Sequence, residues 1–152
     1  MVSMNRAPYY IELALLVVLL CMYGFMSYQR NLVWQDDMSL WTDNVKKAPG
    51  NPRAYQYLGL AYHDVKDFDN AIIQYKKSLS LNPLQPDVHN NIGVSYFNRG
   101  DVDTAIMHFK HALSINPSHA DAHYNLGIAY GEKGLVDLAQ EEIRKGMKLP
   151  RR

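Results

Sequence analysis

The pattern of apolar and polar residues changes abruptly near residue 30. From Tyr9 to Tyr28, twenty residues in all, apolar side chains form an almost unbroken run in which Glu12 is the only charge. A helix of this length spans roughly 30 Å, which matches the hydrocarbon core of a bilayer. Tyrosines lie at both ends, where interfacial aromatic residues are common. The pattern predicts a transmembrane helix over residues 9–28, after a short N-terminal tail over residues 1–8.

A cleaved signal fits this apolar run less well than an anchor does. A signal peptide would have a shorter apolar core and an Ala-x-Ala-like site, and the stretch CMYGFMSYQR contains no such site. A lipoprotein signal would have a small residue before Cys21, where Leu20 stands. We therefore expect a single-pass anchor. Arg6 on one side, against Arg30 followed by two aspartates on the other, slightly favours a cytoplasmic N-terminus. The rest of the chain would then lie on the extracytoplasmic, periplasmic side.

From residue 52 onward the pattern becomes periodic. Apolar residues recur at helical spacing in paired segments, and the short stretches VKDFD, NRGDV and EKGLVD separate the two segments of each pair. Each unit is therefore expected to form two antiparallel helices, which small residues allow to approach closely. The residues that recur every 34 positions are Gly59, Gly93 and Gly127; Tyr62, Tyr96 and Tyr130; and Ala71, Ala105 and Ala139.

This 34-residue unit, with Pro83 and Pro117 near its end, resembles the tetratricopeptide repeat family. The resemblance implies an all-α fold in which helix pairs stack into an α-solenoid. One unit cannot bury its apolar face alone, and about three stacked units are needed for stability. We expect repeats over residues 52–85, 86–119 and 120–150. With a preceding half-repeat, the solenoid would contain about 3.5 repeats.

The stretch between the predicted span and the first repeat, residues 29–51, is interpreted as a docking segment and half-repeat. Trp41 precedes Tyr75 by 34 residues, and Pro49 precedes Pro83 by the same distance. MSLWTDNVKKAP is therefore in register with the second helix of a repeat. A flexible spacer would be rich in Gly, Ser or Pro, whereas this stretch contains several large apolar side chains. We expect it to pack against the first helix of the first repeat.

The same stretch also resembles the C-terminal end of certain multi-spanning membrane glycosyltransferases. In those enzymes an Arg-Asn-x-x-Trp pairing and a Leu-Trp pair follow the last membrane helix and precede tetratricopeptide repeats. The residues that carry the likeness are Arg30, Asn31, Trp34, Leu40 and Trp41. The likeness implies an extracytoplasmic position for the repeats but no activity, because only one span is predicted. We interpret Asp36 and Asp37 as solvent-exposed carboxylates at the start of a helix, where negative charge is favourable, and not as catalytic residues.

In tetratricopeptide arrays, the first helices of successive repeats line a concave groove, and positions 34 residues apart form stripes along it. One stripe here is apolar. Others carry Asn and Gln, whose amides donate and accept hydrogen bonds and so suit the backbone of an extended peptide. The alternative is that these residues are repeat consensus without a ligand. The predicted partner-binding groove contains Gln56, Tyr57, Leu60, His63, Asn90, Asn91, Val94, Phe97, Tyr124, Asn125 and Ile128.

One type of groove ligand is argued against. Arrays that clamp the acidic C-terminus of chaperones carry a set of Lys, Arg and Asn residues on the groove. The matching positions here are Gln56, Leu60, Asn91, Asp121 and Asn125. Only Asn91 agrees with that set, and the carboxylate of Asp121 would repel an acidic ligand. The sequence does not predict a carboxylate clamp.

Composition and candidate chemistry narrow the function further. The chain has 16 basic and 15 acidic residues and a net charge of +1, which provides no basic face for nucleic acid. Cys21 is the only cysteine, so no disulfide is expected within the chain. Two close pairs of histidines, His108 with His111 and His119 with His123, lack the further ligands that zinc would need. We expect no metal, no cofactor and no catalytic residues.

The last repeat differs from those before it. Gly146 replaces an alanine found earlier in the array, which predicts weaker packing of the final helix. One interpretation is that the charged outer face of the last helix, with Glu141, Glu142, Arg144 and Lys145, keeps the end of the array soluble. The alternative is that a partner or a second copy of the chain covers an apolar edge formed by Leu138, Met147 and Leu149.

These features predict a membrane-anchored protein–protein interaction module. It would act as an accessory, scaffold or assembly subunit of a membrane complex, using the span in the bilayer and the groove for protein partners. Two alternatives stay open. One is a non-catalytic C-terminal piece of a glycosyltransferase of the kind described above, and the other is a self-assembling homo-oligomer.

Overall fold

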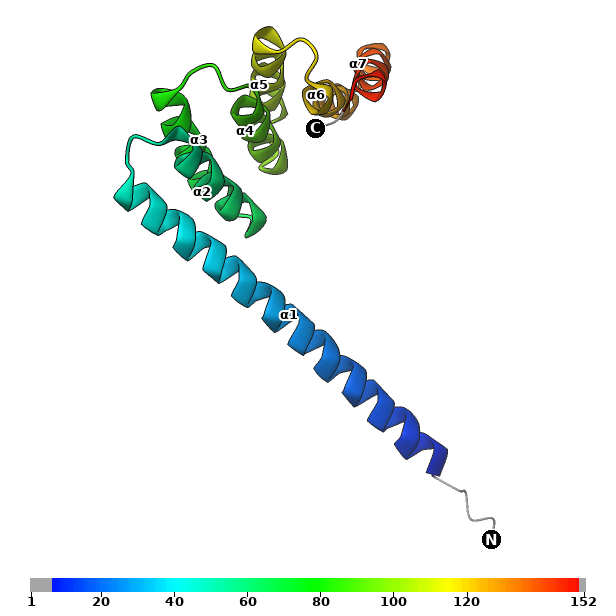
Figure 1. Cartoon of the computed structure of the whole chain (residues 1–152). Coiled ribbons are helices and arrows are strands. Elements are labelled where there is room, and N and C mark those ends of the chain that lie inside the picture. Colours follow the sequence, from blue (N-terminus) through cyan, green and yellow to red (C-terminus); the bar gives the residue numbers. More distant parts are fainter. Residues whose placement is uncertain (1–6, 151–152) are drawn as a thin grey trace. The chain divides into compact units, whose positions relative to one another are not determined.

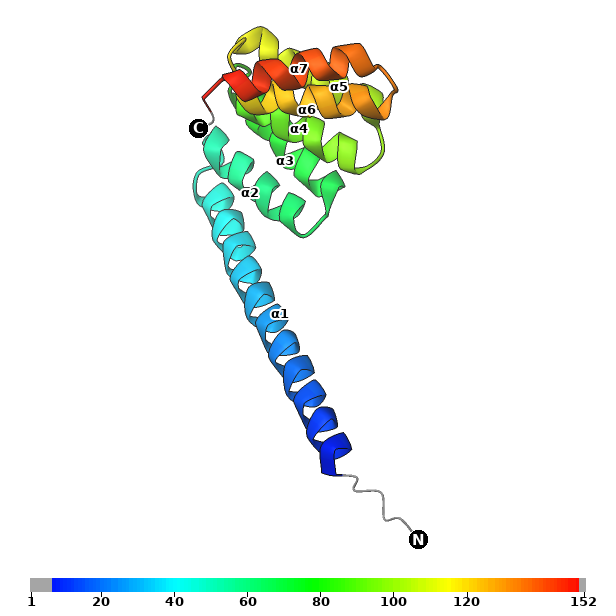
Figure 2. The same cartoon turned by 90° about the vertical axis from the view of Figure 1, so that its right-hand side faces the viewer.

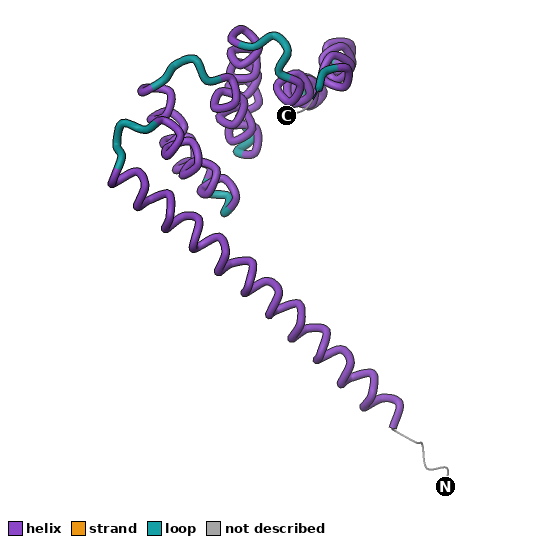
Figure 3. The backbone as a smooth tube through the Cα atoms, in the orientation of Figure 1, coloured by secondary structure: helices purple, strands orange, loops and turns teal. Residues whose placement is uncertain are grey.

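The structure is a computed structural model that describes residues 7–150, with side chains described for residues 15–26 and 37–150. Within this range every element of regular secondary structure is a helix, as Figure 3 shows. The predicted all-α fold is therefore confirmed. The chain divides into two compact units between Asp37 and Met38, and each is described by itself.

Helix α1, Ala7–Lys47, has 41 residues and covers the predicted span and residues 29–47 of the docking segment. The side chains of residues 15–26 are all exposed, and most of them are large and apolar. Among the residues whose side chains are described, no helix is both long enough and apolar enough to cross a membrane. The predicted span also includes residues 9–14 and 27–28, whose side chains lie outside the described part.

Residues 52–148 form a stack of helix pairs. The two helices of each repeat contact each other, and the second helix of one repeat contacts the first helix of the next. Figures 1 and 2 show this stack from two sides. The predicted α-solenoid of stacked helix pairs is confirmed. Its helices are α2 (Pro52–Asp64), α3 (Phe68–Leu81), α4 (Pro86–Asn98), α5 (Val102–Ile115), α6 (Ala120–Glu132) and α7 (Val136–Lys148).

The same tight turn joins the two helices of each repeat. Lys66, Gly100 and Gly134 stand at equivalent positions and have φ angles of 63°, 86° and 73°. This left-handed conformation suits glycine, which has no Cβ, whereas Lys66 adopts it at a conformational cost. Asp67 and Asp101 follow the turn in repeats 1 and 2, and their side chains cap α3 and α5 by accepting hydrogen bonds from main-chain N–H groups.

Glycines of the first helices allow close contact with large aromatic side chains of the second helices. A Cβ atom on Gly59 would lie 2.5 Å from Cε1 of Tyr75, and one on Gly93 would lie 2.5 Å from Cε1 of Phe109. Both rings are fully buried. The prediction that these glycines allow close helix approach is therefore confirmed.

Two apolar clusters hold the repeats together. The cluster between repeats 1 and 2 contains Ala71, Tyr75, Val88 and Ile92. The cluster between repeats 2 and 3 contains Ala105, Phe109, Leu126, Ala129, Tyr130 and Ala139. Ion pairs recur near the turns with the same 34-residue spacing, Asp69 with Arg99 at 3.0 Å and Asp103 with Lys133. Because these pairs are largely exposed, they add little to stability, and apolar burial dominates the interfaces.

The hydroxyl of Tyr75 is the one buried side-chain polar atom without a hydrogen-bond partner among the described residues. Burial raises its pKa, so it stays protonated. We expect Tyr75→Phe, which copies Phe109 of repeat 2, to raise the free energy of unfolding by up to about 1 kcal/mol, because it removes a desolvated donor and keeps the ring. Urea unfolding checks this, with Tyr62→Phe as a half-buried control. A clear loss of stability in Tyr75→Phe would show that the hydroxyl has a partner.

In repeat 3 the glycines approach main-chain atoms. A Cβ on Gly146 would lie 2.8 Å from the carbonyl oxygen of Ala120 and 3.0 Å from the nitrogen of Tyr124, and one on Gly127 would lie 2.9 Å from the carbonyl oxygen of Ala139. The prediction that Gly146 weakens the final packing is therefore wrong. The missing Cβ is what lets α7 approach α6 so closely.

Candidate functional site

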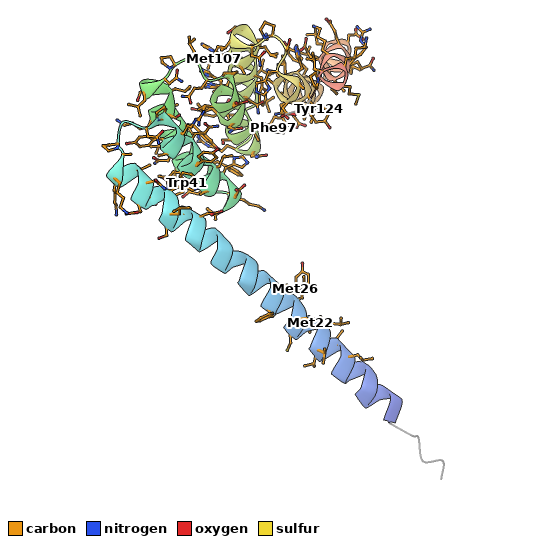
Figure 4. All side chains as sticks on the ribbon, in the orientation of Figure 1. Met22, Met26, Trp41, Phe97, Met107 and Tyr124 are labelled. Carbon is orange, nitrogen blue, oxygen red and sulfur yellow. The ribbon has the colours of Figure 1, made fainter. Side chains whose placement is uncertain are left out.

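The face formed by the first helices of the repeats is the candidate partner-binding surface. Helices α2, α4 and α6 contact one another in succession, and all eleven predicted groove residues lie on them. Tyr57 and Ile128 are the most exposed of these, at 42% and 39%, and Asn90 is buried. The others are half-buried, including Phe97 on α4 and Tyr124 on α6, which Figure 4 labels. The predicted residues thus lie on three helices that contact one another in succession, and neighbours partly cover most of the side chains.

The apolar stripe of this face contributes to the packing between repeats. This stripe consists of Leu60, Val94 and Ile128. Leu60 packs against the cluster between repeats 1 and 2, and Val94 packs against the cluster between repeats 2 and 3, as does Phe97 of a neighbouring stripe. Ile128, in the last repeat, keeps an exposed side chain. The stripe therefore has a structural role along its length and offers an open apolar contact at Ile128.

The amide side chains divide into two groups. Nδ2 of Asn125 donates to Oδ1 of Asn90 at 3.0 Å, so a hydrogen bond between α6 and α4 occupies part of both amides. No described residue hydrogen-bonds the half-buried side chains of Gln56 and Asn91. The amides of Gln56 and Asn91 therefore remain available to hydrogen-bond a partner, whereas the amide of Asn125 stabilises the contact between α4 and α6.

Trp41, from the predicted docking segment, extends this face. Its ring stacks on the ring of Tyr57, with centroids 4.5 Å apart and an interplanar angle of 18°. Figure 4 marks Trp41 near the C-terminal end of α1. The contact confirms that this residue of the docking segment packs on the first helix of repeat 1. Part of the Tyr57 ring is therefore covered, and Trp41 is a candidate binding residue that the groove prediction missed.

His63 lies where the face meets the turn of repeat 1. Its Nδ1 is 3.0 Å from Oγ of Ser95, which donates to the main-chain carbonyl of Asn91 at 2.9 Å. Its ring meets Phe68 edge-on. Burial lowers the pKa of His63, although the carboxylate of Asp64 acts in the opposite direction. Because Ser95 is fully buried, this pair holds α2 to α4 and offers no accessible nucleophile.

Two pockets that open to solvent lie near the ends of the first helices. The first, of about 500 Å³, is lined by His63, Asp64, Lys66, Phe68 and Asn98. The second, of about 240 Å³, is lined by Pro86, Asp87, Asn116, Ser118, His119, Ala120, Asp121 and Pro150. In the second pocket, Nε2 of His119 lies 3.0 Å from Oδ1 of Asp87. Carboxylates line both pockets, so the pockets suit a polar ligand group better than an apolar ligand that needs an enclosed cavity.

The histidine pair His119 and His123 does not share a common ligand position. Nδ1 of His123 lies 2.6 Å from Oε2 of Glu142, and its Nε2 lies 2.9 Å from the carbonyl oxygen of Pro117. Burial acts to raise the pKa of Glu142, but hydrogen bonds from Lys145 and His123 outweigh it and lower that pKa. Within the described part of the chain, no group of three His, Cys, Asp or Glu side chains is placed to hold a metal ion.

Several solved structures resemble this fold. A crystal structure of MamA has a TM-score of 0.70 and 27% identity over 76% of this chain and 67% of that chain. A second MamA structure, MSR-1, has a TM-score of 0.65 and 27% identity over 80% and 70%. The chain thus spans about two thirds of the length of these MamA chains. The TPR domain of Sgt2 from Aspergillus fumigatus has a TM-score of 0.62 and 25% identity over 64% of both chains.

A more distant likeness shows the fold alone. The first TPR of Spaghetti (RPAP3), bound to the HSP90 peptide SRMEEVD, is 20% identical over 64% of this chain and 78% of that chain, with a TM-score of 0.63. No match is found among curated proteins. A family model described as TPR repeat matches residues 59–100 and 95–134, and one described as Tetratricopeptide repeat matches residues 120–152. Together these matches cover more than half of the chain, which belongs to the tetratricopeptide repeat family.

Proposed function

We propose that the chain is a membrane-anchored protein–protein interaction module that acts as an accessory, scaffold or assembly subunit of a membrane complex. The face of α2, α4 and α6 carries this proposal. It is open to solvent at Tyr57 and Ile128, and it holds the amides of Gln56 and Asn91, which have no partner among the described residues. Membership of a family built from stacked repeats supports the same function, because such stacks present extended binding surfaces.

An extended segment of a partner protein fits this face chemically. The amides of Gln56 and Asn91 can both donate and accept, so they would bind main-chain N–H and C=O groups of the segment. Apolar side chains of the segment would contact Ile128 and the accessible parts of Leu60 and Val94. In this division of roles, the main-chain contacts provide affinity and the apolar contacts provide selectivity.

The charged residues of these three helices indicate which partner segments would bind poorly. The charged residues of α2, α4 and α6, apart from histidines, are one cation and four carboxylates: Arg53, Asp64, Asp87, Asp121 and Glu132. An acidic peptide would meet like charges along this face. We therefore propose a neutral or basic partner segment. An acidic peptide such as SRMEEVD, which is bound in the RPAP3 structure, is not expected to bind here.

The anchor is proposed from the N-terminal helix. Residues 15–26 expose a series of large apolar side chains, and an apolar surface of this kind marks a membrane or protein contact in a native protein. A span over residues 9–28 would hold the repeats at the extracytoplasmic, periplasmic surface. Washing native membranes with alkaline carbonate tests this part: the full-length chain should stay with the membrane, and its release into the wash would contradict the anchor.

Capture of partners from the native membrane in gentle detergent tests the groove. We expect the tagged full-length chain to retain membrane subunits in fixed stoichiometry. The double variant Gln56→Ala with Asn91→Ala should retain roughly a tenth as much, because the two lost hydrogen bonds to the partner together cost about 1.4 kcal/mol. Gln140→Ala is the matched control, since it removes an exposed amide from α7, outside the face.

The outcomes separate the proposal from its alternatives. Equal capture by the double variant and the wild type would overturn the groove as the binding surface. Recovery of the chain only with copies of itself would exclude an accessory subunit and favour a homo-oligomer, in which the exposed Leu138 and Met147 are covered by another copy. Capture of a membrane glycosyltransferase that lacks its own repeats would identify the chain as the non-catalytic tail of that enzyme.

A further inference from the structure

Three histidines of repeat 2 meet between α4 and α5. The ring of His89 on α4 stacks on the ring of His111 on α5, with centroids 4.1 Å apart. Nδ1 of His89 also lies 3.5 Å from Nδ1 of His108. His89 is buried and His108 is half-buried. Two facing nitrogens at this distance are compatible with one proton between them but not with two, because two N–H groups would then point at each other.

The charged groups around this cluster are mainly cations. From α3, Nζ of Lys76 donates to the hydroxyl of Tyr96 at 3.1 Å. The Tyr96 ring on α4 stacks on His108 with centroids 5.6 Å apart, and the guanidinium of Arg99 lies 5.7 Å from the centroid of the Tyr96 ring. Asp87, two residues before His89, is paired with a histidine of repeat 3. No ion pair in the described part of the chain brings a carboxylate to the cluster.

Burial and these neighbours disfavour protonation of His108 and His89. Burial, followed by the charges of His89, Lys76 and His111, lowers the pKa of His108 to about 4. Burial and His111 likewise lower the pKa of His89, although a hydrogen bond to the main chain of Pro83 acts in the opposite direction. The folded state therefore holds the imidazoles of His89 and His108 neutral at pH values where the unfolded chain binds protons.

Equivalent positions of the other repeats show what is unusual here. Repeat 1 has Tyr55, Gln74 and Lys77 at these three positions, and repeat 3 has His123, Glu142 and Lys145. In repeat 3, the carboxylate of Glu142 accepts hydrogen bonds from His123 at 2.6 Å and from Lys145 at 2.8 Å. An acid thus compensates the two bases of repeat 3, whereas repeat 2 has three bases and no acid at the same place.

We propose that the cluster of His89, His108 and His111 is a pH-sensitive switch that loosens repeat 2 when the surroundings become mildly acidic. Neutral imidazoles stack and share a proton, whereas protonation brings like charges together in a partly buried site. Because folding lowers the His108 pKa from 6.5 to about 4, its contribution to stability is complete above pH 6.5. That contribution is lost as the pH falls from 6.5 toward 4.

The switch has a consequence for binding that rests on the proposed function. Helix α4 carries both His89 and the candidate binding residues Asn91 and Val94. Loosening α4 would therefore disturb the partner-binding face, and mild acid would release the partner. The experiment below follows the stability of the chain itself, so its result does not depend on whether a partner binds.

Urea unfolding of the full-length chain in detergent micelles tests the switch. Between about pH 7.5 and about pH 5, the unfolding equilibrium constant of the wild type should rise roughly tenfold, a value reduced from the full shift because His108 is only half-buried. His108→Gln, the residue of repeat 1, should remove most of this rise. His108→Glu should remove or reverse it, because it gives His89 the carboxylate partner found in repeat 3.

A control and a local measurement complete the design. His63→Gln removes a histidine outside the cluster whose pKa burial also lowers, and it should remove a smaller part of the rise than His108→Gln does. Hydrogen exchange near pH 5 should show the earliest loss of protection in α4 and α5. The same pH dependence in the wild type and both His108 variants would overturn the switch. So would acid-induced exchange that begins outside α4 and α5.

Discussion

Replacing Gly127 by alanine is expected to lower the free energy of unfolding of the array by about 3 kcal/mol, the upper part of the range for overpacked sites. A Cβ atom here would lie 2.6 Å from Cγ1 of Ile143, 2.9 Å from the carbonyl oxygen of Ala139 and 3.0 Å from the nitrogen of Ile143. Two of these are main-chain atoms of α7, which cannot rotate away as a side chain can. Helices α6 and α7 would have to separate.

Gly131→Ala is the matched control, because Gly131 lies one helical turn further along α6. Its Cβ would meet only the Cβ of Ala139, at an ordinary 3.9 Å. We expect this variant to gain about 0.5–1 kcal/mol, since alanine favours a helix more than glycine does. Urea unfolding followed by circular dichroism measures both. If Gly127→Ala also gained stability, the close contact between α6 and α7 would be refuted.

Gly146→Ala is expected to lower the free energy of unfolding by about 2 kcal/mol, although alanine has the higher helix propensity. The added Cβ would lie 2.8 Å from the carbonyl oxygen of Ala120 and 3.0 Å from the nitrogen of Tyr124. The loss should be smaller than at Gly127, because Gly146 lies near the end of α7, which can shift more easily than its middle.

The same unfolding experiment decides the sign of this effect. Hydrogen exchange adds a local measurement: faster exchange in α7 and in the first turn of α6 is expected for Gly146→Ala and not for the Gly131→Ala control. A stabilised Gly146→Ala variant would restore the expectation drawn from the sequence, in which the missing methyl group leaves the last repeat under-packed.

The fold was predictable because the same residue types recur every 34 positions along the sequence. Glycine and a large aromatic residue recur together at Gly59 with Tyr75 and at Gly93 with Phe109, so the close contact of the first two helix pairs follows from the spacing. Gly146 shows the limit of this reasoning. Comparison with the preceding repeat shows that a methyl group is missing, but whether the space is filled by main chain depends on the distance between α6 and α7, which spacing does not report.

The candidate site was predictable only in part, for a related reason. Columns of residues 34 positions apart assign Asn91 and Asn125 to the first helices of repeats 2 and 3, where α4 and α6 contain them. They do not show that Asn125 reaches across columns to Asn90, or that Trp41 covers part of Tyr57. Such contacts depend on side-chain direction and on the offset between neighbouring helices. The cluster of His89, His108 and His111 was missed because its members lie on two helices and meet only after the pair closes.

The helix-to-helix contact pattern also bears on how the array comes apart. Among the described repeats, each contacts the repeats next to it in the stack and not those further away, so the stability of the array approximates that of a linear chain of coupled units. An end unit has one coupling and the middle unit has two. A perturbation confined to repeat 2 therefore weakens both couplings at once. Repeats 1 and 3 would then unfold more independently of each other. Cooperativity, and with it the meaning of a single melting temperature for this protein, thus depends on the middle repeat.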